Sequence, residues 1–250
     1  MRAQELTLSY AGRAVLTDLT FELRRGAITA VIGVNGCGKS TLLRALAGLH
    51  APSAGTLTGP AQSPPIVRRR ELAYLPQRLP DQPALSVREF VMMSAGSPTR
   101  WFPSQEATQR AQEALELLQL NDLSERPCAA LSGGEYRRVA LAACFAQGAR
   151  WLVLDEPCAG LDLHQAARFM GCVRTWLKGQ RDRGVVVVVH DLNLCAQYAD
   201  ECLLIDAGTL QAQGPADELL SSAALETAYG SLQRFRHPQR DHLVILGEAP

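Results

Sequence analysis

The chain has 250 residues, of which 47% are hydrophobic, and its 25 basic and 25 acidic side chains give a formal charge of zero. This length allows one large α/β domain, or one with a smaller appended lobe. The balanced charge excludes a global field that would attract nucleic acid, so we expect no nucleic-acid partner. No apolar stretch approaches the roughly 18–20 residues that a membrane span needs.

The cysteines and the N-terminus indicate a cytoplasmic protein. The seven cysteines form no C-x-x-C pair and no cluster with histidine, which predicts reduced thiols that serve mostly as small core residues. The first residues do not resemble a secretory signal. The one basic run, residues 68–70, is short, and we interpret it as part of a solvated loop.

Two kinds of apolar pattern predict strands in the N-terminal third of the chain. Alternating segments predict antiparallel strands, and continuous runs predict buried strands. The alternating segments are residues 6–10 and 19–23, and the continuous ones are 28–32 and 72–75. Proline and glycine predict a turn at residues 52–55 and a loop at residues 59–65.

The rest of the chain changes first to helix formers and then back to strands. Residues 81–147 are rich in helix formers, and residues 106–120 carry one apolar helical stripe. Strands return at residues 151–155, 185–190, 202–206 and 243–246, and helical stretches lie at 163–176 and 192–198. This alternation predicts a parallel, doubly wound sheet with its ligand at the carboxyl ends of the strands. The helical insertion would stand off the sheet as a second lobe.

A glycine-rich segment, Gly-Val-Asn-Gly-Cys-Gly-Lys-Ser-Thr, lies between the predicted strand at 28–32 and a helical pattern. This context turns a match to G-x-x-x-x-G-K-[ST] into a phosphate-binding loop, in which backbone N–H groups and the helix dipole bind an anion. Lys39 is expected to reach the outer phosphates and Ser40 to ligate Mg²⁺. The expected nucleotide-binding residues of the loop are Gly33, Asn35, Gly36, Cys37, Gly38, Lys39, Ser40 and Thr41.

Cys37 lies between two glycines of this loop and close to Lys39. Positive potential and a helix start lower the pKa of a thiol. We therefore expect Cys37 to be the most reactive of the seven cysteines, with Mg-ATP protecting it from alkylation.

Two adjacent carboxylates end the predicted buried strand at residues 151–155. Side chains alternate along a strand, so Asp155 and Glu156 are expected to point in different directions and to take different roles. Asp155 is expected to reach Mg²⁺, directly or through water. Glu156 is expected to orient or deprotonate the water that attacks the γ-phosphate.

The run Leu131-Ser132-Gly133-Gly134-Glu135 precedes an apolar helix and is a second anion-binding helix start. Here the chain resembles the ATP-binding cassette (ABC) family, whose signature is this LSGG run. The resemblance covers about residues 6–230, and its motifs occur in the family's order. They are the phosphate loop at 33–40, Gln77, the signature at 131–135, Asp155-Glu156, the run at 159–162 and His190.

This resemblance implies an α/β fold with a P-loop NTPase core, a parallel sheet, N-terminal antiparallel strands and an inserted helical subdomain. It implies one nucleotide-binding domain over residues 1–250, with a RecA-like core at about 1–80 and 148–250 and the helical subdomain at about 81–147. Two such domains would bind two ATP molecules head to tail. Ser132, Gly133, Gly134 and Glu135 of one copy would then face the phosphate loop of the other.

The resemblance also implies roles for single residues. Tyr10 would stack on adenine, and His190 would contact the γ-phosphate and hold Glu156. Gln77 would contact Mg²⁺ and the attacking water, and Asp162 would couple the two ATP sites. Mg²⁺ is the expected cofactor, with Ser40, Gln77 and Asp155 around it. The run after Glu156 differs from the family's common pattern, which puts the fine coupling by Asp162 in doubt but not the ATPase activity.

A cassette with no membrane span of its own must pass mechanical work to other chains. We expect an importer ATPase at the cytoplasmic face of a bacterial inner membrane, acting on separate permease subunits and indirectly with a substrate-binding protein. Soluble cassettes that act on DNA or ribosomes are the alternative, but their second cassette, coiled coil or basic arms are not found here. Residues 77–101 are expected to dock the permease.

The cargo follows only from finer resemblance. The runs at 190–194, 197–200 and 161–165, with Ala228-Tyr229-Gly230, look like those of importers of metal chelates, namely iron-siderophore, haem and cobalamin. The segment at 87–93 and Trp101-Phe102 also resemble zinc and manganese importers. We expect a metal chelate, with zinc or manganese as the alternative.

Overall fold

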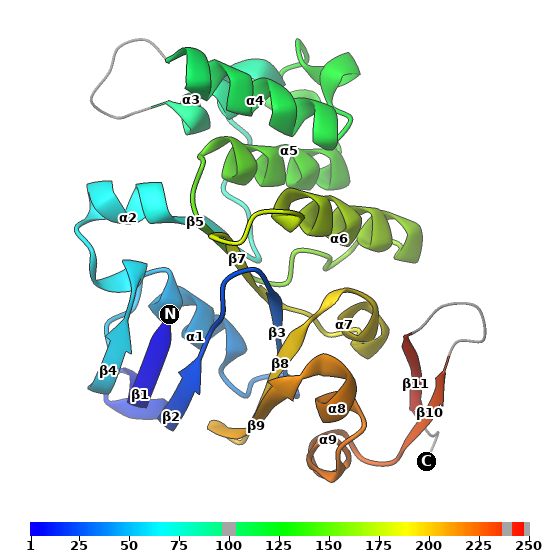
Figure 1. The fold of residues 1–250 in the computed structure, drawn as a ribbon. Helices are drawn as coiled ribbons and strands as arrows, with labels where there is room; N and C mark the ends of the chain where they lie inside the picture. Colours follow the sequence, from blue (N-terminus) through cyan, green and yellow to red (C-terminus); the bar gives the residue numbers. More distant parts are fainter. Residues whose placement is uncertain (97–103, 237–241, 248–250) are drawn as a thin grey trace.

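The computed structural model describes residues 1–96, 104–236 and 242–247. Six strands form its central sheet (Figure 1), in the order fifth, sixth, seventh, third, eighth and ninth along the chain. They are β3 (Ile28–Ile32), β5 (Leu72–Leu75), β6 (Trp151–Leu154), β7 (Gly184–Val188), β8 (Glu201–Asp206) and β9 (Thr209–Pro215). All neighbours pair in parallel except β8 and β9. Every residue of β3, β6 and β7 is buried, as the continuous apolar runs predicted.

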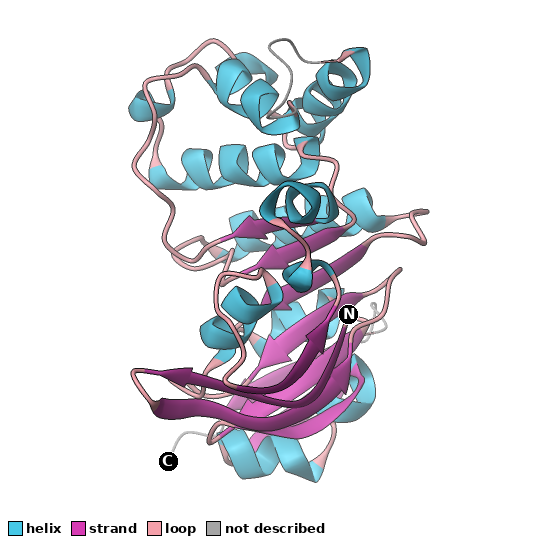
Figure 2. Ribbon diagram, turned by 90° about the vertical axis from the view of Figure 1, so that its left-hand side faces the viewer, coloured by secondary structure: helices cyan, strands magenta, loops and turns pink. Residues whose placement is uncertain are grey.

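A smaller antiparallel sheet is formed by β1 (Arg2–Tyr10), β2 (Arg13–Glu22) and β4 (Ala54–Thr58), with β1 in the middle. Figure 2 shows the strands of the two sheets as adjacent layers. Helix α1 (Lys39–Leu46) shares one core with both sheets, because its leucines pack with apolar residues of β1 and with the facing side of the central sheet. The packing fixes the helix, and therefore the loop before it, against the carboxyl end of β3.

Three helices make a lobe at the opposite end of the molecule from this small sheet (Figure 1). They are α3 (Val87–Ala95), α4 (Gln105–Leu117) and α5 (Gly133–Ala146), with two 3₁₀ turns at Asn121–Leu123 and Cys128–Ala130. The predicted apolar stripe of α4 is buried at Ala107, Ala111, Ala114 and Leu115. Capping boxes start α3 at Ser86 and α5 at Ser132.

The remaining helices cover the central sheet or follow it. They are α6 (Leu163–Leu177), α7 (Leu192–Tyr198), α8 (Ala216–Leu220) and α9 (Ala223–Tyr229). A hairpin of β10 (Leu232–Arg236) and β11 (Leu243–Gly247) ends the described chain and lies beside α7. The amide of Asn193 on α7 donates to the carbonyl of Ile245 at 3.1 Å and accepts from its N–H at 2.8 Å. Among the described residues, no helix is long and apolar enough to cross a membrane.

The predicted fold class is confirmed, with a parallel sheet, N-terminal antiparallel strands and inserted helices. Two local predictions were wrong. Residues 68–70 are not a loop but part of α2 (Pro65–Glu71), which Pro65 can start because a first helical residue needs no N–H partner. The guanidinium of Arg68 donates to the carbonyls of Gly48 and Ala61. The predicted turn at 52–55 overlaps the start of β4, which pairs with β1.

Candidate active site

The carboxyl ends of four neighbouring strands, β5, β6, β7 and β3, carry the predicted phosphate loop and the predicted catalytic residues. The phosphate loop follows β3, and Gln77 follows β5. Asp155 and Glu156 follow β6, and His190 follows β7. Because parallel strands end at the same edge of a sheet, the topology brings these segments together from positions far apart in the chain.

The phosphate loop is held in shape by its glycines and by Lys39. Gly33 has a φ of +148°, and a Cβ there would lie 2.0 Å from the carbonyl oxygen of Ile205, so only glycine fits. The ammonium group of Lys39 donates to the carbonyls of Gly33 at 2.7 Å and Val34 at 2.9 Å. Asn35 and Gly36 are exposed, and Thr41 is buried in α1.

Tyr229 is hydrogen-bonded to the first residue of this loop. Its hydroxyl oxygen accepts a hydrogen bond from the N–H of Gly33 at 2.7 Å. Burial raises the pKa of Tyr229 to about 12, so the phenol stays neutral. In the sequence Tyr229 stands out only as part of a family-like ending, and nothing there indicates this contact.

Ser40 and Asp155 form the second part of the site. The Ser40 hydroxyl donates to one carboxylate oxygen of Asp155 at 2.9 Å, and the Tyr74 hydroxyl donates to the other at 3.3 Å. Asp155 is only 1% exposed, and burial raises its pKa above the ordinary value although both hydrogen bonds oppose the shift. Burial and the charge of Asp155 raise the pKa of Tyr74 to about 12. The contact of Tyr74 was not predicted from the sequence.

The donors around Ser40 and Asp155 fit Mg²⁺. A hydroxyl and a carboxylate are hard oxygen ligands, and Mg²⁺ is commonly held by one or two carboxylates together with substrate phosphates. Within the described part of the chain, no three His, Cys, Asp or Glu side chains gather as a metal site. A cavity of about 400 Å³ opens beside Asp155. Its lining residues are Arg44, Tyr74, Pro76, Gln77, Arg78 and Asp155.

Glu156 lies between Gln77 and His190. One of its carboxylate oxygens accepts from the side-chain amide of Gln77 at 2.6 Å, and the other lies 2.7 Å from Nε2 of His190. The carboxylates of Asp155 and Glu156 therefore have different partners, as predicted, although strand alternation is not the reason because both residues lie beyond the end of β6 at Leu154. The backbone of Glu156 has a φ of +48°, a left-handed conformation that costs energy for a residue with a side chain.

Arg137 on α5 is a residue that the sequence analysis missed. Its Nη1 donates to the carbonyls of Glu156 at 3.0 Å and Pro157 at 3.2 Å, and its Nη2 donates to the carbonyl of Gln77 at 3.0 Å. The sequence shows only that an arginine lies two residues after Glu135, which does not indicate the carbonyls that it contacts. Arg137 joins the helical lobe to both loops that carry the carboxylate and amide of the site.

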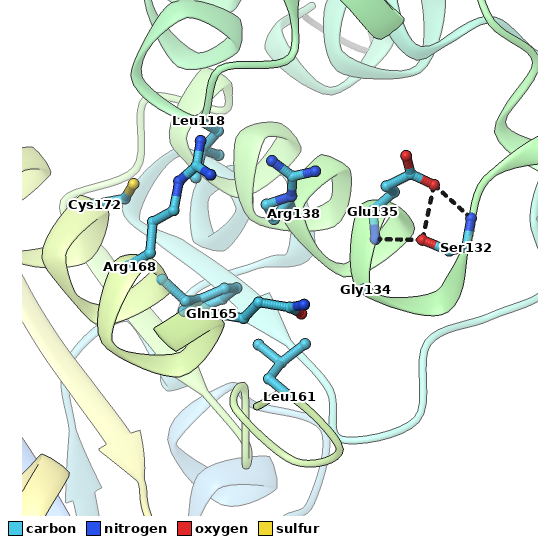
Figure 3. Close-up of a pocket in the computed structure, with 10 residues that line it drawn as sticks. Leu118, Ser132, Gly134, Glu135, Arg138, Leu161, Gln165, Arg168 and Cys172 are labelled. Carbon is cyan, nitrogen blue, oxygen red and sulfur yellow. Dashed lines mark hydrogen bonds between the residues drawn. The ribbon is translucent and has the colours of Figure 1, made fainter. Parts of the chain in front are cut away.

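The signature residues lie at the start of α5. Ser132 is the N-cap, and its hydroxyl accepts from the N–H of Glu135 at 3.3 Å and donates to the Glu135 carboxylate at 2.7 Å (Figure 3). Hydrogen bonds from the N–H and hydroxyl of Ser132 lower the pKa of Glu135. Gly133 is exposed, and a Cβ there would have no neighbour within 4 Å. In the described residues no hydrogen bond joins Ser132, Gly133 or Gly134 to the phosphate loop of the same chain.

A cavity of about 190 Å³ lies beside this helix start, between α5 and α6. Figure 3 shows Arg138 from α5 and Arg168 and Gln165 from α6 around it. Asp162, the residue expected to couple two ATP sites, is the N-cap of α6 and accepts from the N–H of Gln165 at 2.8 Å. The signature and the segment of Asp162 therefore meet at one surface.

Tyr10 ends β1 and is 41% exposed. Its ring stacks on His50, with centroids 4.4 Å apart, and its hydroxyl accepts from Arg44 at 3.2 Å. The sequence analysis did not find these two contacts.

The lowered pKa predicted for the thiol of Cys37 is wrong. Cys37 is 6% exposed, and burial raises the pKa of its thiol, while the charge of Lys39 lowers it by less. The sequence shows the neighbouring lysine but does not show the burial.

The comparisons with known proteins agree on one family. The ABC transporter family model matches residues 16–159. The chain belongs to the ABC transporter family. It is 37% identical to the achromobactin transport ATP-binding protein CbrD of Dickeya dadantii over 91% of this chain and 86% of that protein. It is also 37% identical to the hemin import ATP-binding protein HmuV of Gloeobacter violaceus, over 96% of this chain and 90% of that protein.

Two further similarities bear on this ABC protein. The manganese transport system ATP-binding protein MntB of Listeria innocua is 34% identical over 92% of this chain and 96% of its own length. A solved structure described as an inward-facing conformation of a putative metal-chelate type ABC transporter aligns with a TM-score of 0.82 and 26% identity, over 98% of this chain and 95% of that chain. The ABC protein has the mixed α/β cassette fold and is an ATPase.

Proposed function

We propose that this ABC ATPase powers uptake of a metal chelate through separate membrane permease subunits, and that it cleaves ATP at the carboxyl ends of β3, β5, β6 and β7. The observation that carries the proposal is the contact of Glu156 with both Gln77 and His190, beside a phosphate loop. A carboxylate held by two partners next to a triphosphate site is suited to orienting one water molecule.

ATP binding is assigned to the phosphate loop and to Tyr10. The phosphates are assigned to the loop from Gly33 to Thr41, in which the N–H of Gly33 itself donates to Tyr229 and the later N–H groups serve the nucleotide. Lys39 moves from the loop carbonyls to the outer phosphates. The ammonium group of Lys39 donates to two loop carbonyls within 3 Å before ATP binds. Moving to the phosphates exchanges these hydrogen bonds for new ones, so the ammonium group is not left without acceptors. Tyr10 stacks on adenine with its exposed surface.

Mg²⁺ is assigned to Ser40 and Asp155, with Gln77 at its edge. The ion supplies charge neutralisation of the phosphate oxygens when it is bound. Before Mg²⁺ binds, hydrogen bonds from the hydroxyls of Ser40 and Tyr74 hold the carboxylate of Asp155 in place. Gln77 donates to Glu156 through its side-chain nitrogen, so its side-chain oxygen is the atom that would reach the ion.

Hydrolysis is assigned to Glu156, His190 and Gln77. Glu156 accepts the proton of the attacking water, or orients that water, and His190 holds Glu156 and contacts the γ-phosphate. His190 is 42% exposed and Glu156 14% exposed at the side chain, so the imidazole can reach a nucleotide while the carboxylate stays shielded.

The site needs a second copy of the chain to be complete. Ser132, Gly133 and Gly134 are exposed or half-buried and make no hydrogen bond to their own phosphate loop among the described residues. In a head-to-tail dimer, Ser132, Gly133, Gly134 and Glu135 of one copy close the phosphate site of the other, and Asp162 couples the two sites. Closure would exclude water from the γ-phosphate.

The docking surface for the permease is assigned to the helical lobe, in the segment that follows β5 and Gln77. Val87 and Val91 are fully buried in the lobe, whereas Met93 is 59% exposed and Phe90 and Met92 are partly buried. Of the large apolar residues described within the surface predicted at residues 77–101, those that are not buried are Leu79, Leu85, Phe90, Met92 and Met93. Trp101 and Phe102 lie outside the described residues. The protein would then sit at the cytoplasmic face of the membrane, with a substrate-binding protein delivering cargo on the other side.

The cargo proposal rests on the named relatives. The hemin import protein and the metal-chelate type transporter structure favour a chelate, and the manganese transport protein favours a bare ion as the second candidate. The test uses this chain assembled with its own permease and binding protein in liposomes. ATP hydrolysis is measured with hemin, a ferric siderophore, cobalamin, Mn²⁺ or Zn²⁺. Stimulation by Mn²⁺ or Zn²⁺ alone would replace the chelate proposal.

A further inference from the structure

Arg137 contacts the two catalytic loops from outside the nucleotide site. Its guanidinium donates to the backbone carbonyls of Gln77 and Glu156, the same two residues whose side chains are joined at 2.6 Å. The loops of Gln77 and Glu156 are therefore connected in two ways, directly through their side chains and indirectly through the guanidinium of Arg137. Arg137 reaches no side chain that we place at the phosphates or at Mg²⁺, so any effect on the reaction must pass through the loops.

The shape of the arginine side chain suits this role. A guanidinium is planar and presents several donors in a fixed fork, so the distance between the bonded carbonyls is set by the side chain itself. Lysine carries a compact ammonium group and cannot impose that spacing. Glu156 also needs external support, because its φ of +48° is maintained only where the surroundings hold it.

Helix α5 gives Arg137 a second connection. Ser132, which we assign to the ATP of the partner copy, is the N-cap of the same helix and lies five residues before Arg137, about 7.5 Å along the axis. At the other end of α5, the side-chain amide of Gln147 donates to the carbonyl of Leu72 at 2.8 Å. Leu72 starts β5 and Gln77 follows its end, so side chains of the α5 segment are hydrogen-bonded at both ends of this strand.

We propose that Arg137 is a positioning residue: it sets the separation of Gln77 and Glu156 in its own chain and transmits to them any displacement of the signature end of α5. The inference rests on the proposed dimeric ATPase site. ATP held by Ser132 in the partner's site would shift α5, and Arg137 would carry that shift to the water-orienting Glu156 of its own site. Each site would then report its occupancy to the other.

The first test compares Arg137→Gln with Arg110→Gln in the purified full-length chain. Arg110 is a matched control because it also joins backbone carbonyls of separate segments, Ala146 and Ala95, but both lie within the helical lobe. Arg137→Gln is expected to lower kcat about tenfold or more with the KM for ATP changed by less than about threefold, since misplacing a reacting group costs rate rather than binding. Arg110→Gln is expected to lower the melting temperature similarly and to leave kcat within about twofold.

Arg137→Lys gives the conservative comparison. Because an ammonium group can meet one carbonyl but cannot fix the separation of two, its kcat is expected between those of the wild type and Arg137→Gln. The proposal is overturned if Arg137→Gln keeps a kcat within about twofold of wild type, or if Arg110→Gln loses as much. These kinetics test Arg137 whether or not a dimer can be isolated.

The second test separates action within a chain from action across a dimer. Two differently tagged copies are co-purified so that one copy carries Glu156→Gln and only the other copy can hydrolyse ATP. Arg137→Gln is placed either in the inactive copy or in the active one. Activity is expected to fall about tenfold only when Arg137→Gln lies in the active copy.

Equal activities, or a larger loss when the inactive copy carries Arg137→Gln, would contradict positioning within the chain. A pair in which both copies carry Glu156→Gln serves as the control for the proposed site. If that pair hydrolyses ATP normally, the assignment of Glu156 fails, and this outcome is distinct from a failure of the Arg137 proposal.

Discussion

The carboxylate of Glu156 accepts a hydrogen bond of 2.6 Å from the side-chain amide of Gln77. These residues follow different strands and come from positions 79 residues apart, yet β5 and β6 are direct neighbours in the sheet. Gln77 also lines the cavity that opens beside Asp155, so its side chain is bonded to Glu156 and borders the site that we assign to Mg²⁺. Contact of Gln77 with bound Mg-ATP would therefore connect occupancy of the phosphate site to the position of Glu156.

The first prediction concerns Glu156→Gln. An amide keeps the shape of the carboxylate but cannot accept a proton, so turnover is expected to fall on the order of a hundredfold or more while ATP affinity stays unchanged. The slow step should leave an ATP-bound dimer that size-exclusion chromatography detects. Lys39→Ala is the contrasting variant and should weaken ATP binding itself. Near-normal turnover in purified Glu156→Gln would remove Glu156 from the mechanism.

The sequence was sufficient to predict which segments meet at the site. Gly33, Gln77 and Glu156 each follow a predicted strand and His190 ends one, and the carboxyl ends of parallel strands meet at one edge of a sheet. This rule needs no knowledge of side-chain packing, and it placed the phosphate loop, the carboxylates and the histidine correctly relative to the strands.

The contacts that depend on packing could not be predicted. Arg137 meets carbonyls 19 and 60 residues away, and no periodicity of α5 says which carbonyls those are. The prediction of a low pKa for Cys37 was wrong for a related reason, because the sequence shows the charge of Lys39 but not the burial that outweighs it. The helix at Pro65–Glu71 was missed because Pro65 was interpreted as the end of a loop and the basic run at 68–70 as part of a solvated one.

The second prediction concerns Cys37. Because burial raises the pKa of its thiol and only 6% of the residue is exposed, a maleimide at neutral pH should react slowly with the folded protein and leave ATPase activity largely intact. Mass spectrometry of the alkylated protein would identify the modified cysteines. Cys37→Ser controls for modification elsewhere. Rapid inactivation that Mg-ATP prevents and Cys37→Ser abolishes would show a reactive thiol after all.

The third prediction concerns Tyr229→Phe. The substitution removes the acceptor of the Gly33 N–H and leaves that donor unsatisfied, which costs about 1–3 kcal/mol when the group is buried. We expect a lower melting temperature together with a higher Kd for ATP, because Gly33 begins the phosphate loop. Tyr198→Phe is the comparison, since its hydroxyl donates to the carbonyl of Ala167, away from the loop. If both variants lose stability but bind ATP like wild type, Tyr229 supports only the fold.

The last prediction concerns the pH dependence of stability through Asp155. Burial raises the pKa of Asp155 in the folded protein above that in the unfolded chain, so the folded state binds the proton more tightly. Stability is therefore lost as the pH rises from the unfolded pKa through the raised folded pKa, and the full cost remains at neutral pH. Asp155→Asn carries no such charge, and the nucleotide-free variant should melt at a higher temperature than wild type at pH 7.

The difference between Asp155→Asn and wild type should shrink as the pH is lowered and vanish below the unfolded pKa, where both side chains are neutral. Differential scanning calorimetry without nucleotide and without Mg²⁺ measures it across that range. The stabilised variant should also lose the ability of Mg-ATP to raise the melting temperature, because the carboxylate is the expected magnesium ligand. A variant that melts below wild type at pH 7 would show that the hydrogen bonds from Ser40 and Tyr74 outweigh the cost of burying the charge.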